Sequence, residues 1–212
     1  MMKLKADSVF KSIKGKSILS DINLDLKSGT VYGIVGRNGS GKTMLFRALS
    51  GLMKIDSGEI NCDGNVLGKD ISILPSLGIV LENAGLYPEF TGLMNLSLLA
   101  KLNNRIEKDD IVCAIKRLGL DPSDKRPYGK YSLGMKQRIV LAQAIMEKPE
   151  VIMLDEPTNA LDENGIKDIR EIILQEKKRG ALILIASHNK EDISMLADEV
   201  FYMSEGRISE RQ

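Results

Sequence analysis

The fold is decided by the stretch Gly36-Arg37-Asn38-Gly39-Ser40-Gly41-Lys42-Thr43, which matches the phosphate-binding pattern G-x-x-x-x-G-K-[ST] at every fixed position. The apolar run at residues 31–35 predicts a buried strand before this loop, and residues 43–49 predict a helix after it that ends at Gly51. Loop amides and a helix N-terminus both attract anions, so a strand, a glycine-rich loop and a helix in this order form a phosphate cradle.

Every residue of this loop is expected to contact a nucleotide. Its glycines let the backbone curl so that successive N–H groups point at phosphate oxygens. Lys42 is expected to supply a point charge for the outer phosphates, and the Thr43 hydroxyl to ligate the Mg²⁺ that accompanies the nucleotide. We therefore predict a nucleotide and Mg²⁺ site over residues 36–43, with a glycine-rich turn carrying a chance lysine as the structural alternative.

The composition favours one large domain over residues 1–212. The 43% hydrophobic content is enough for one sizeable core, and the formal net charge of +1 gives no reason to expect a nucleic-acid partner.

The apolar runs at 151–154 and 181–186 are far shorter than the ~20 residues that cross a bilayer. The sequence opens without a secretory leader, and Cys62 and Cys113 lack metal-ligand spacing, so we expect a reducing cytoplasm and two buried thiols.

The order of predicted elements divides the chain into a core and an insertion. Residues 4–31 alternate apolar runs with turn signals, which is typical of antiparallel strands. Further strands are expected near residue 60 and at 76–81, 151–154, 181–186 and 199–203, and helices at 91–102, 108–118, from 132 to before Pro149, and at 163–178.

This order predicts an α/β fold of the P-loop NTPase class. Its core is a mostly parallel sheet with helices on both faces, joined by an N-terminal antiparallel β subdomain and an inserted helical subdomain. The core and the β subdomain are predicted over residues 1–87 and 146–212, and the helical subdomain over residues 88–145.

Two adjacent carboxylates, Asp155 and Glu156, follow the apolar strand predicted at 151–154. Ligands bind at the carboxyl ends of parallel strands, so this strand end is expected near the phosphate loop. Asp155 is predicted to ligate Mg²⁺, directly or through water, and Glu156 to polarise the water that attacks the γ-phosphate. A solvated strand end before the Pro157 turn is the alternative.

His188 is the sole histidine, and it closes the strand predicted at 181–187. A lone histidine at a strand end is often structural. Here its strand is expected in the same sheet as the phosphate-loop strand and the carboxylate strand, with its end on the same edge. We therefore predict that His188 contacts the γ-phosphate and helps to hold the attacking water and Glu156 in place.

A second anion site is predicted at Ser132-Leu133-Gly134-Met135-Lys136, where a helix begins. A serine N-cap is ordinary by itself. The helix N-terminus and the Ser132 hydroxyl are nevertheless available to a phosphate. One chain is not expected to bring this site and the phosphate loop to one nucleotide, whereas two chains arranged head to tail can do so.

With these motifs in this order, the chain resembles the nucleotide-binding subunits of ATP-binding cassette (ABC) transporters over nearly its whole length. Residues 36–43 are similar to the Walker A loop, 151–156 to Walker B with its catalytic glutamate, 159–162 to the D-loop, 132–136 to the LSGGQ signature, and His188 to the switch histidine. The resemblance implies a dimer that sandwiches two ATP, each held by one subunit's Walker A and by Ser132, Gly134 and Met135 of the other. The other subunit is a second copy or a paired ABC ATPase.

The resemblance also implies a membrane setting. The permease is expected to be a separate integral-membrane chain, with this ATPase cytoplasmic and peripheral on the inner face of the cell membrane. Leu133 and Met135 replace the glycine and glutamine of the signature, and this variant with Lys136-Gln137-Arg138 is similar to the drug and peptide exporter branch that includes bacitracin-type exporters.

Two further positions depart from the family pattern. Glu82 stands at the Q-loop position in place of glutamine, and its carboxylate is predicted to ligate Mg²⁺. Ile13 stands where the family has the aromatic residue that stacks on adenine, so it is the predicted base contact, and GTP is expected to compete with ATP.

The leading interpretation is thus an ATPase subunit that energises an exporter of drugs, peptides or lipids. A soluble ABC-type ATP switch in DNA repair or on ribosomes is the second class. A small-molecule kinase with the same phosphate loop is the third, and it leaves residues 132–138 and the pair of Glu156 and His188 unexplained.

Overall fold

The computed structural model describes residues 2–81 and 85–211. The strands are β1 (Lys3–Ile13), β2 (Lys16–Lys27), β3 (Val31–Val35), β4 (Ser57–Cys62), β5 (Asn65–Val66), β6 (Leu77–Val80), β7 (Val151–Asp155), β8 (Leu182–Ala186), β9 (Glu199–Ser204) and β10 (Arg207–Arg211). The helices are α1 (Lys42–Ser50), α2 (Gly92–Asn103), α3 (Lys108–Arg117), α4 (Leu133–Ile145), α5 (Glu163–Lys178) and α6 (Lys190–Leu196), with a 3-10 turn at Tyr128–Lys130.

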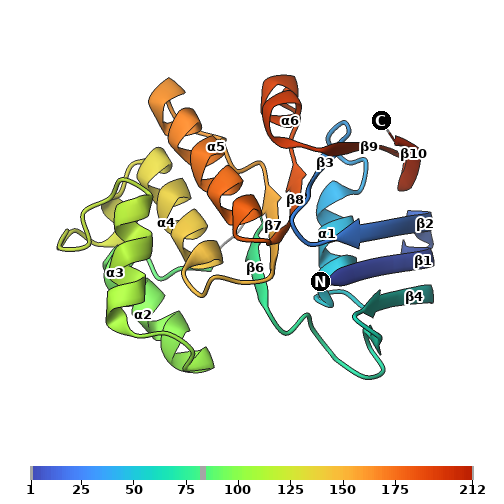
Figure 1. Cartoon of the computed structure of the whole chain (residues 1–212), viewed down its shortest axis with the longest axis horizontal. Coiled ribbons are helices and arrows are strands. Elements are labelled where there is room, and N and C mark those ends of the chain that lie inside the picture. The colour runs from blue at the N-terminus through green and yellow to red at the C-terminus, as the bar shows by residue number, and fades with distance from the viewer. Residues whose placement is uncertain (1, 82–84, 212) are drawn as a thin grey trace.

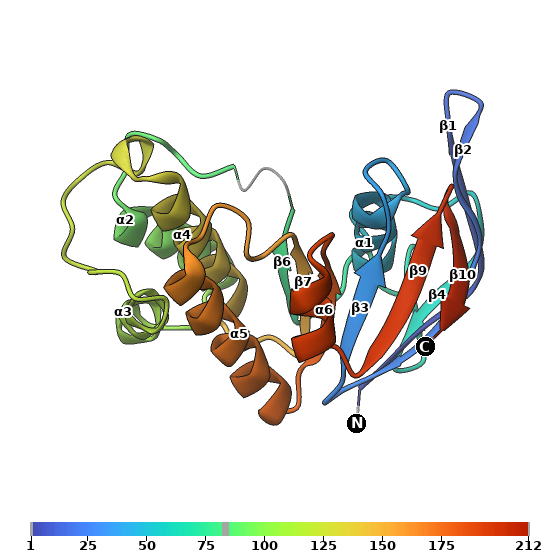
Figure 2. The ribbon, with the colours of Figure 1, turned by 90° about the horizontal axis from the view of Figure 1, so that it is seen from above.

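These elements form layers. Figure 1 shows α2, α3 and α4 in a lobe on one side of the central strands, and β1, β2 and β4 on the other side. Seen from above in Figure 2, α1 lies between the central strands and the antiparallel strands. Helices therefore cover both faces of the central sheet, as the sequence predicts.

The central sheet places three predicted site segments at one edge. Its strand order is β10-β9-β3-β8-β7-β6, and all of its strands run parallel except β10. The phosphate-loop strand β3 pairs with β8, and β8 pairs with β7, with Asp155 opposite Ala186. The carboxyl ends of these neighbouring strands therefore carry the phosphate loop, His188 and the two carboxylates side by side.

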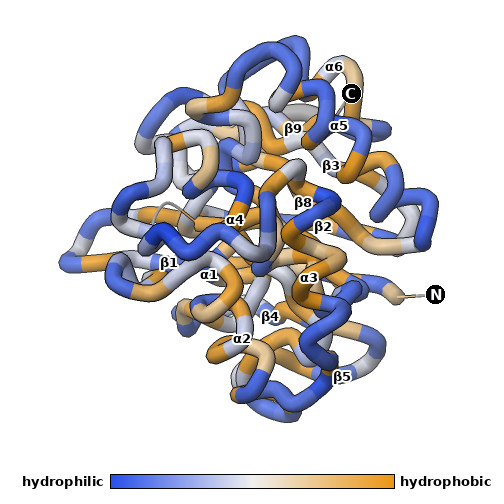
Figure 3. The backbone as a smooth tube through the Cα atoms, turned by 90° about the vertical axis from the view of Figure 1, so that its left-hand side faces the viewer, coloured by the Kyte–Doolittle hydropathy of each residue, from blue (hydrophilic) through white to orange (hydrophobic). Residues whose placement is uncertain are grey.

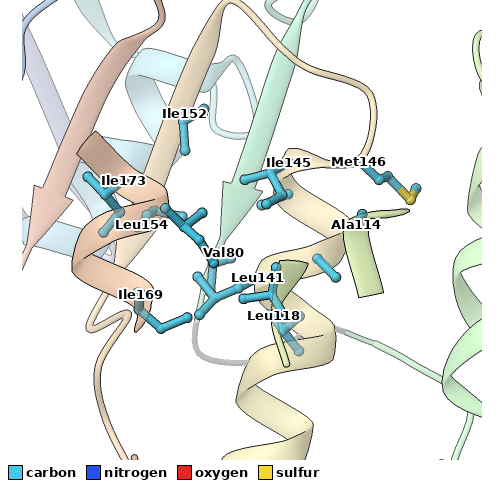
Figure 4. Packing of buried hydrophobic residues seen from close by; sticks show 14 of the residues in the cluster. Val80, Ala114, Leu118, Leu141, Ile145, Met146, Ile152, Leu154, Ile169 and Ile173 are labelled. Atoms are coloured by element: carbon cyan, nitrogen blue, oxygen red, sulfur yellow. The ribbon is translucent and has the colours of Figure 1, made fainter. Parts of the chain in front are cut away.

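The core is divided by the alternation of side chains along the buried strands. On β8, Leu182 and Leu184 pack with α1 and the antiparallel sheet, whereas Ile183 and Ile185 pack with the helices on the other face. Figure 4 shows part of this second cluster, where Leu154 of β7 meets Ile169 and Ile173 of α5 and Leu141 of α4. Both faces are buried, which explains why β7 and β8 are apolar throughout.

The helical lobe is seated directly on the sheet. A Cβ at Gly78 of β6 would lie 1.8 Å from the carbonyl oxygen of Ala144 in α4, so only glycine permits this close approach. Helix α2 is capped at both ends, because the Thr91 hydroxyl accepts a hydrogen bond from the amide of Met94 and Asn104 adopts a left-handed conformation. The proposed division of the chain at residues 88 and 145 stays a prediction.

Two details differ from the expectations. Strand β10 was not predicted, although the Glu205-Gly206 turn before it is an ordinary hairpin signal. Cys113 is exposed rather than buried, because it lies on the outer face of α3, while Cys62 is buried as expected.

Hydrophobic residues are spread over many short segments (Figure 3), and no helix within residues 2–81 and 85–211 is long and apolar enough to span a bilayer.

Candidate nucleotide site

The phosphate loop joins β3 to α1 and keeps a shape that its glycines require. Gly41, directly before α1, has a φ of 111°, a conformation that other residues rarely adopt. At Gly36, a Cβ would lie 2.4 Å from the carbonyl oxygen of Met203 and 2.5 Å from Ser40 Oγ. The Ser40 hydroxyl is buried, and within the described residues it has no hydrogen-bond partner. A curled backbone and an unpartnered hydroxyl at its centre fit a ligand rich in acceptor oxygens.

The loop opens onto a cleft of about 710 Å³. The lining residues come from the loop and α1, from the end of β7, from the start of β2 and from the turn before β10: Asn38, Gly39, Gly41, Lys42, Thr43, Met44, Asp155, Glu156, Lys16, Ser17, Ile18, Glu205 and Gly206. The cleft therefore brings together the predicted phosphate loop and both predicted carboxylates.

Lys42 and Thr43, the first residues of α1, point to different parts of this cleft. The Lys42 side chain is buried, and its Nζ donates to the carbonyl oxygens of Gly36 at 2.8 Å and Arg37 at 3.3 Å. The Thr43 hydroxyl donates to Asp155 Oδ2 at 2.5 Å, although the two residues are 112 positions apart. A hydroxyl and a carboxylate held together are the oxygen ligands that Mg²⁺ prefers.

Glu156 and His188 form a pair beside the cleft. Glu156 Oε1 accepts from the backbone amide of His188 at 3.0 Å and lies 2.7 Å from His188 Nδ1, while Oε2 accepts from Ser187 Oγ at 3.3 Å. The His188 side chain is 63% exposed and the Glu156 side chain 21%. The sequence-predicted base and histidine are therefore in direct contact, with the imidazole open to solvent.

The backbone of Glu156 is held in an uncommon conformation. Its φ is 51°, in the left-handed region that costs a residue with a side chain about 1 kcal/mol or more. Gln137 of α4 stabilises this turn, because its Nε2 donates to the carbonyl oxygens of Glu156 at 3.3 Å and Pro157 at 3.1 Å. The helix that begins at the second predicted anion site therefore contacts the chain's own candidate base.

The second predicted anion site lies in the other lobe. Ser132 caps α4 by accepting from the Met135 amide at 3.2 Å, and Leu133 is 70% exposed. Gly134 lies against the loop of residues 159–162, since a Cβ there would be 3.1 Å from the carbonyl oxygen of Ala160. In the part of the chain that the structure describes, none of Ser132, Gly134 and Met135 lines the cleft.

Basic and aromatic side chains surround this helix start. The Arg126 guanidinium lies 5.7 Å from the centre of the Tyr131 ring, and Lys136 Nζ lies 5.7 Å from that of Tyr128. Burial raises the pKa of the Tyr131 phenol, so this neighbour of Ser132 is uncharged at neutral pH. Asp124 pairs with the Arg126 guanidinium at 2.7 Å, so Lys136 is the cation of this pair of contacts that is left to attract an anion.

The predicted base contact is not among the residues that line the cleft. Ile13, the predicted base contact, ends β1 and is 38% exposed at the tip of the β1–β2 hairpin seen in Figure 2. On that side the cleft is lined by Lys16, Ser17 and Ile18. The roles of Ile13 and of the other site residues stay predictions, and Glu82 lies outside the described residues.

Comparisons with known proteins agree with this geometry. The family model described as ABC transporter matches residues 19–159. An uncharacterized ABC transporter ATP-binding protein of Bacillus subtilis (strain 168), YybJ, is 48% identical over 93% of this chain and 91% of its own length. The chain belongs to the ABC transporter family. It is an ATP-binding subunit and an ATPase of this family.

Two further comparisons concern a relative with a named transport role and a solved structure. The bacitracin transport ATP-binding protein BcrA of Bacillus licheniformis is 38% identical over 98% of this chain and 68% of its own length. The solved dimeric structure of MJ0796, a bacterial ABC transporter cassette, superposes with a TM-score of 0.89 over 99% of this ABC ATPase and 97% of that chain, at 23% identity. The second comparison confirms the predicted fold.

Sequence reasoning missed the turn that supports the phosphate loop of this ABC ATPase. The amide of Gly206 donates to the carbonyl oxygen of Ser40 at 2.9 Å, and both Glu205 and Gly206 line the cleft. The turn was visible as a Glu-Gly pair between two apolar runs. The contact of this turn with the phosphate loop could not be predicted from the sequence, because it depends on the pairing of β9 with β3.

Proposed function

We propose that this ABC ATPase energises an exporter of drugs, peptides or lipids by closing as a head-to-tail dimer on two ATP. The observation that carries the proposal is that Thr43, Asp155 and Glu156 line the phosphate-loop cleft, with His188 in contact with Glu156. The likeness to BcrA, named for bacitracin transport, supports an exporter.

The chain's own residues have distinct parts in the reaction. The loop amides and Lys42 bind the phosphates of ATP. Thr43 and Asp155 would hold Mg²⁺, which neutralises charge on the phosphates when it is bound. Glu156 accepts a proton from the water whose oxygen attacks the γ-phosphorus, and the bond from that phosphorus to the leaving ADP oxygen breaks. His188 orients the Glu156 carboxylate through Nδ1 and presents its exposed ring to the γ-phosphate.

The second half of each site is proposed to come from the partner subunit. Within one chain, Ser132 and the phosphate loop belong to different lobes, and the cleft has no wall from α4. The N-terminus of the 13-residue helix α4, with Lys136 nearby, suits a phosphate of the partner's ATP. Gln137 then connects that contact to the Glu156 turn of the same chain.

The proposed permease is a separate membrane protein, and α2 offers a surface for it. Met94, Leu98 and Leu102 recur every fourth residue on α2 and are 47%, 36% and 82% exposed. Such an apolar stripe suits a helix of a partner. This arrangement would place the ATPase on the inner face of the cell membrane. Failure to co-sediment with membranes that contain the permease would count against this part of the proposal.

Mixing two inactive variants tests the shared sites. Lys42→Ala removes the phosphate contact, and Ser132→Asp keeps a good N-cap while it places a carboxylate where the partner's phosphate is proposed. Each variant alone should lack turnover, whereas the mixed dimer contains one site with intact Lys42 and intact Ser132 from different chains. ATP hydrolysis should therefore return on mixing. Thr91→Asp makes the same change at the N-cap of α2 and should leave turnover intact.

A further inference from the structure

A buried polar cluster lies behind the Glu156 and His188 pair, and the reaction described above does not use it. Its members are Thr158, Arg170 and Asp192, with exposures of 6%, 8% and 0%. Charged groups are rarely buried to this extent without several partners, because removing them from water is costly. The cluster therefore needs an explanation beyond packing.

The Asp192 carboxylate is the centre of the cluster. Its Oδ2 accepts from the Thr158 hydroxyl at 2.5 Å, and its Oδ1 accepts from Arg170 Nε at 2.8 Å and lies 2.6 Å from Arg170 Nη2. Arg170 of α5 also reaches Glu191, whose carboxylate is 3.1 Å away and largely exposed. Asp192 thus joins three segments that are distant in the sequence: the turn after β7, helix α5 and helix α6.

Two of these segments directly follow the reacting groups in the chain. Thr158 lies two residues after Glu156, and Asp192 lies in α6, which begins two residues after His188. The intervening Asn189 caps α6, and its backbone amide donates to Ser187 Oγ, which in turn contacts Glu156. Because the His188 ring is 63% exposed, few side-chain contacts fix it, and its position depends on the backbone that the cluster holds.

We propose that Thr158 and Asp192 are positioning residues that keep Glu156 Oε1 in contact with His188 Nδ1, with Arg170 as the counter-charge that lets Asp192 remain buried. The inference rests on the proposed roles of Glu156 and His188. The hydrogen bond between Thr158 and Asp192 fixes the distance between the two segments that follow the reacting groups. Its loss allows the two segments to move apart, while the phosphate loop is untouched.

The test uses Thr158→Val, which keeps the shape of the side chain but removes the hydroxyl, and Thr158→Ser, which keeps the hydroxyl. Loss of one such hydrogen bond should lower kcat by about tenfold in Thr158→Val. The affinity for ATP should not change, because the cluster does not touch the cleft. Thr158→Ser should retain most of the rate. A Thr158→Val protein with normal kcat would overturn the proposal.

A double-mutant cycle separates this inference from the proposed function. Once His188→Ala has removed the ring, Thr158→Val should lower kcat by less than about twofold, since the contact it protects is gone. An undiminished tenfold loss in that background would reject positioning through His188. If instead His188→Ala and Glu156→Gln leave turnover unchanged, the proposed function fails, whatever Thr158→Val does.

The NMR signal of the His188 imidazole tests the same inference without a measurement of turnover. His188 is the only histidine of the chain, so the untagged protein has one imidazole signal in an NMR spectrum. The signal should shift in Thr158→Val and stay near the wild-type position in Thr158→Ser, because only the first change loosens the contact with Glu156. An unchanged signal in a folded Thr158→Val protein would contradict the inference.

Discussion

Helices α1 and α4 of this ABC ATPase both begin at a predicted phosphate site, yet their surroundings differ. The start of α1 lies in a cleft with a buried lysine and the Thr43–Asp155 pair. The start of α4 has an exposed Leu133, and its Ser132 hydroxyl serves as an ordinary cap. A helix N-terminus attracts anions in both places. Only the first lies in a cleft and places a hydroxyl beside a carboxylate, so we propose that the second serves as a site when another molecule faces it.

The largest effect is expected from Glu156→Gln, which removes the proposed base beside the α1 site. Turnover should fall about a thousandfold, within the range for loss of a general base, because the amide does not accept the water's proton. ATP affinity should stay near wild type. Single-turnover measurements with Mg²⁺ and ATP check the rate, and hydrolysis near the wild-type rate would reject Glu156 as the base.

Lys42→Ala breaks the α1 site itself. Losing a charge-assisted contact to phosphate should weaken ATP binding by about a hundredfold, since such bonds contribute up to about 3 kcal/mol. Titration calorimetry measures the affinity. Lys148→Ala, at an exposed lysine outside the cleft, is the matched control and should bind normally. Normal ATP affinity in Lys42→Ala would refute the assignment of residues 36–43 as the phosphate-binding loop.

His188→Ala should leave ATP binding intact and lower turnover by about thirtyfold, because the contact from Nδ1 to Glu156 is lost while the backbone amide contact remains. Steady-state kinetics over a range of ATP concentrations separate the two effects. Intact turnover would show that His188 has only a structural role and does not contribute to the α1 site.

Ser132→Ala should have the smallest effect and addresses the α4 site. Turnover is expected to fall about fivefold through loss of the hydroxyl, and the helix also loses about 1 kcal/mol of capping energy. Thr91→Ala is the control, because Thr91 caps α2 with the same geometry but far from any predicted phosphate. It should lower the unfolding midpoint similarly and leave turnover unchanged. Equal losses of turnover in both variants would reduce Ser132 to a cap.

The sequence predicts the α1 site better than the α4 site for a physical reason. Residues 36–43 carry their own geometry, because the glycines, the lysine and the following helix are adjacent in the chain. The approach of Asp155 to Thr43 followed from the rule that ligands bind at parallel strand ends, and the structure confirms it. Long-range contacts without a local pattern, such as the Gly206 amide on Ser40 and the Asp192 cluster, were not predictable.

The central claim is that the α1 site of one chain and the α4 site of another share each nucleotide. Sedimentation of Glu156→Gln tests it most directly, by comparing the protein with Mg²⁺ and ATP and the same protein with ADP. The account predicts a dimer with ATP, a monomer with ADP, and a monomer in both when Ser132→Asp is added. A dimer that persists after Ser132→Asp, or a Glu156→Gln protein that binds ATP and remains monomeric, would contradict it.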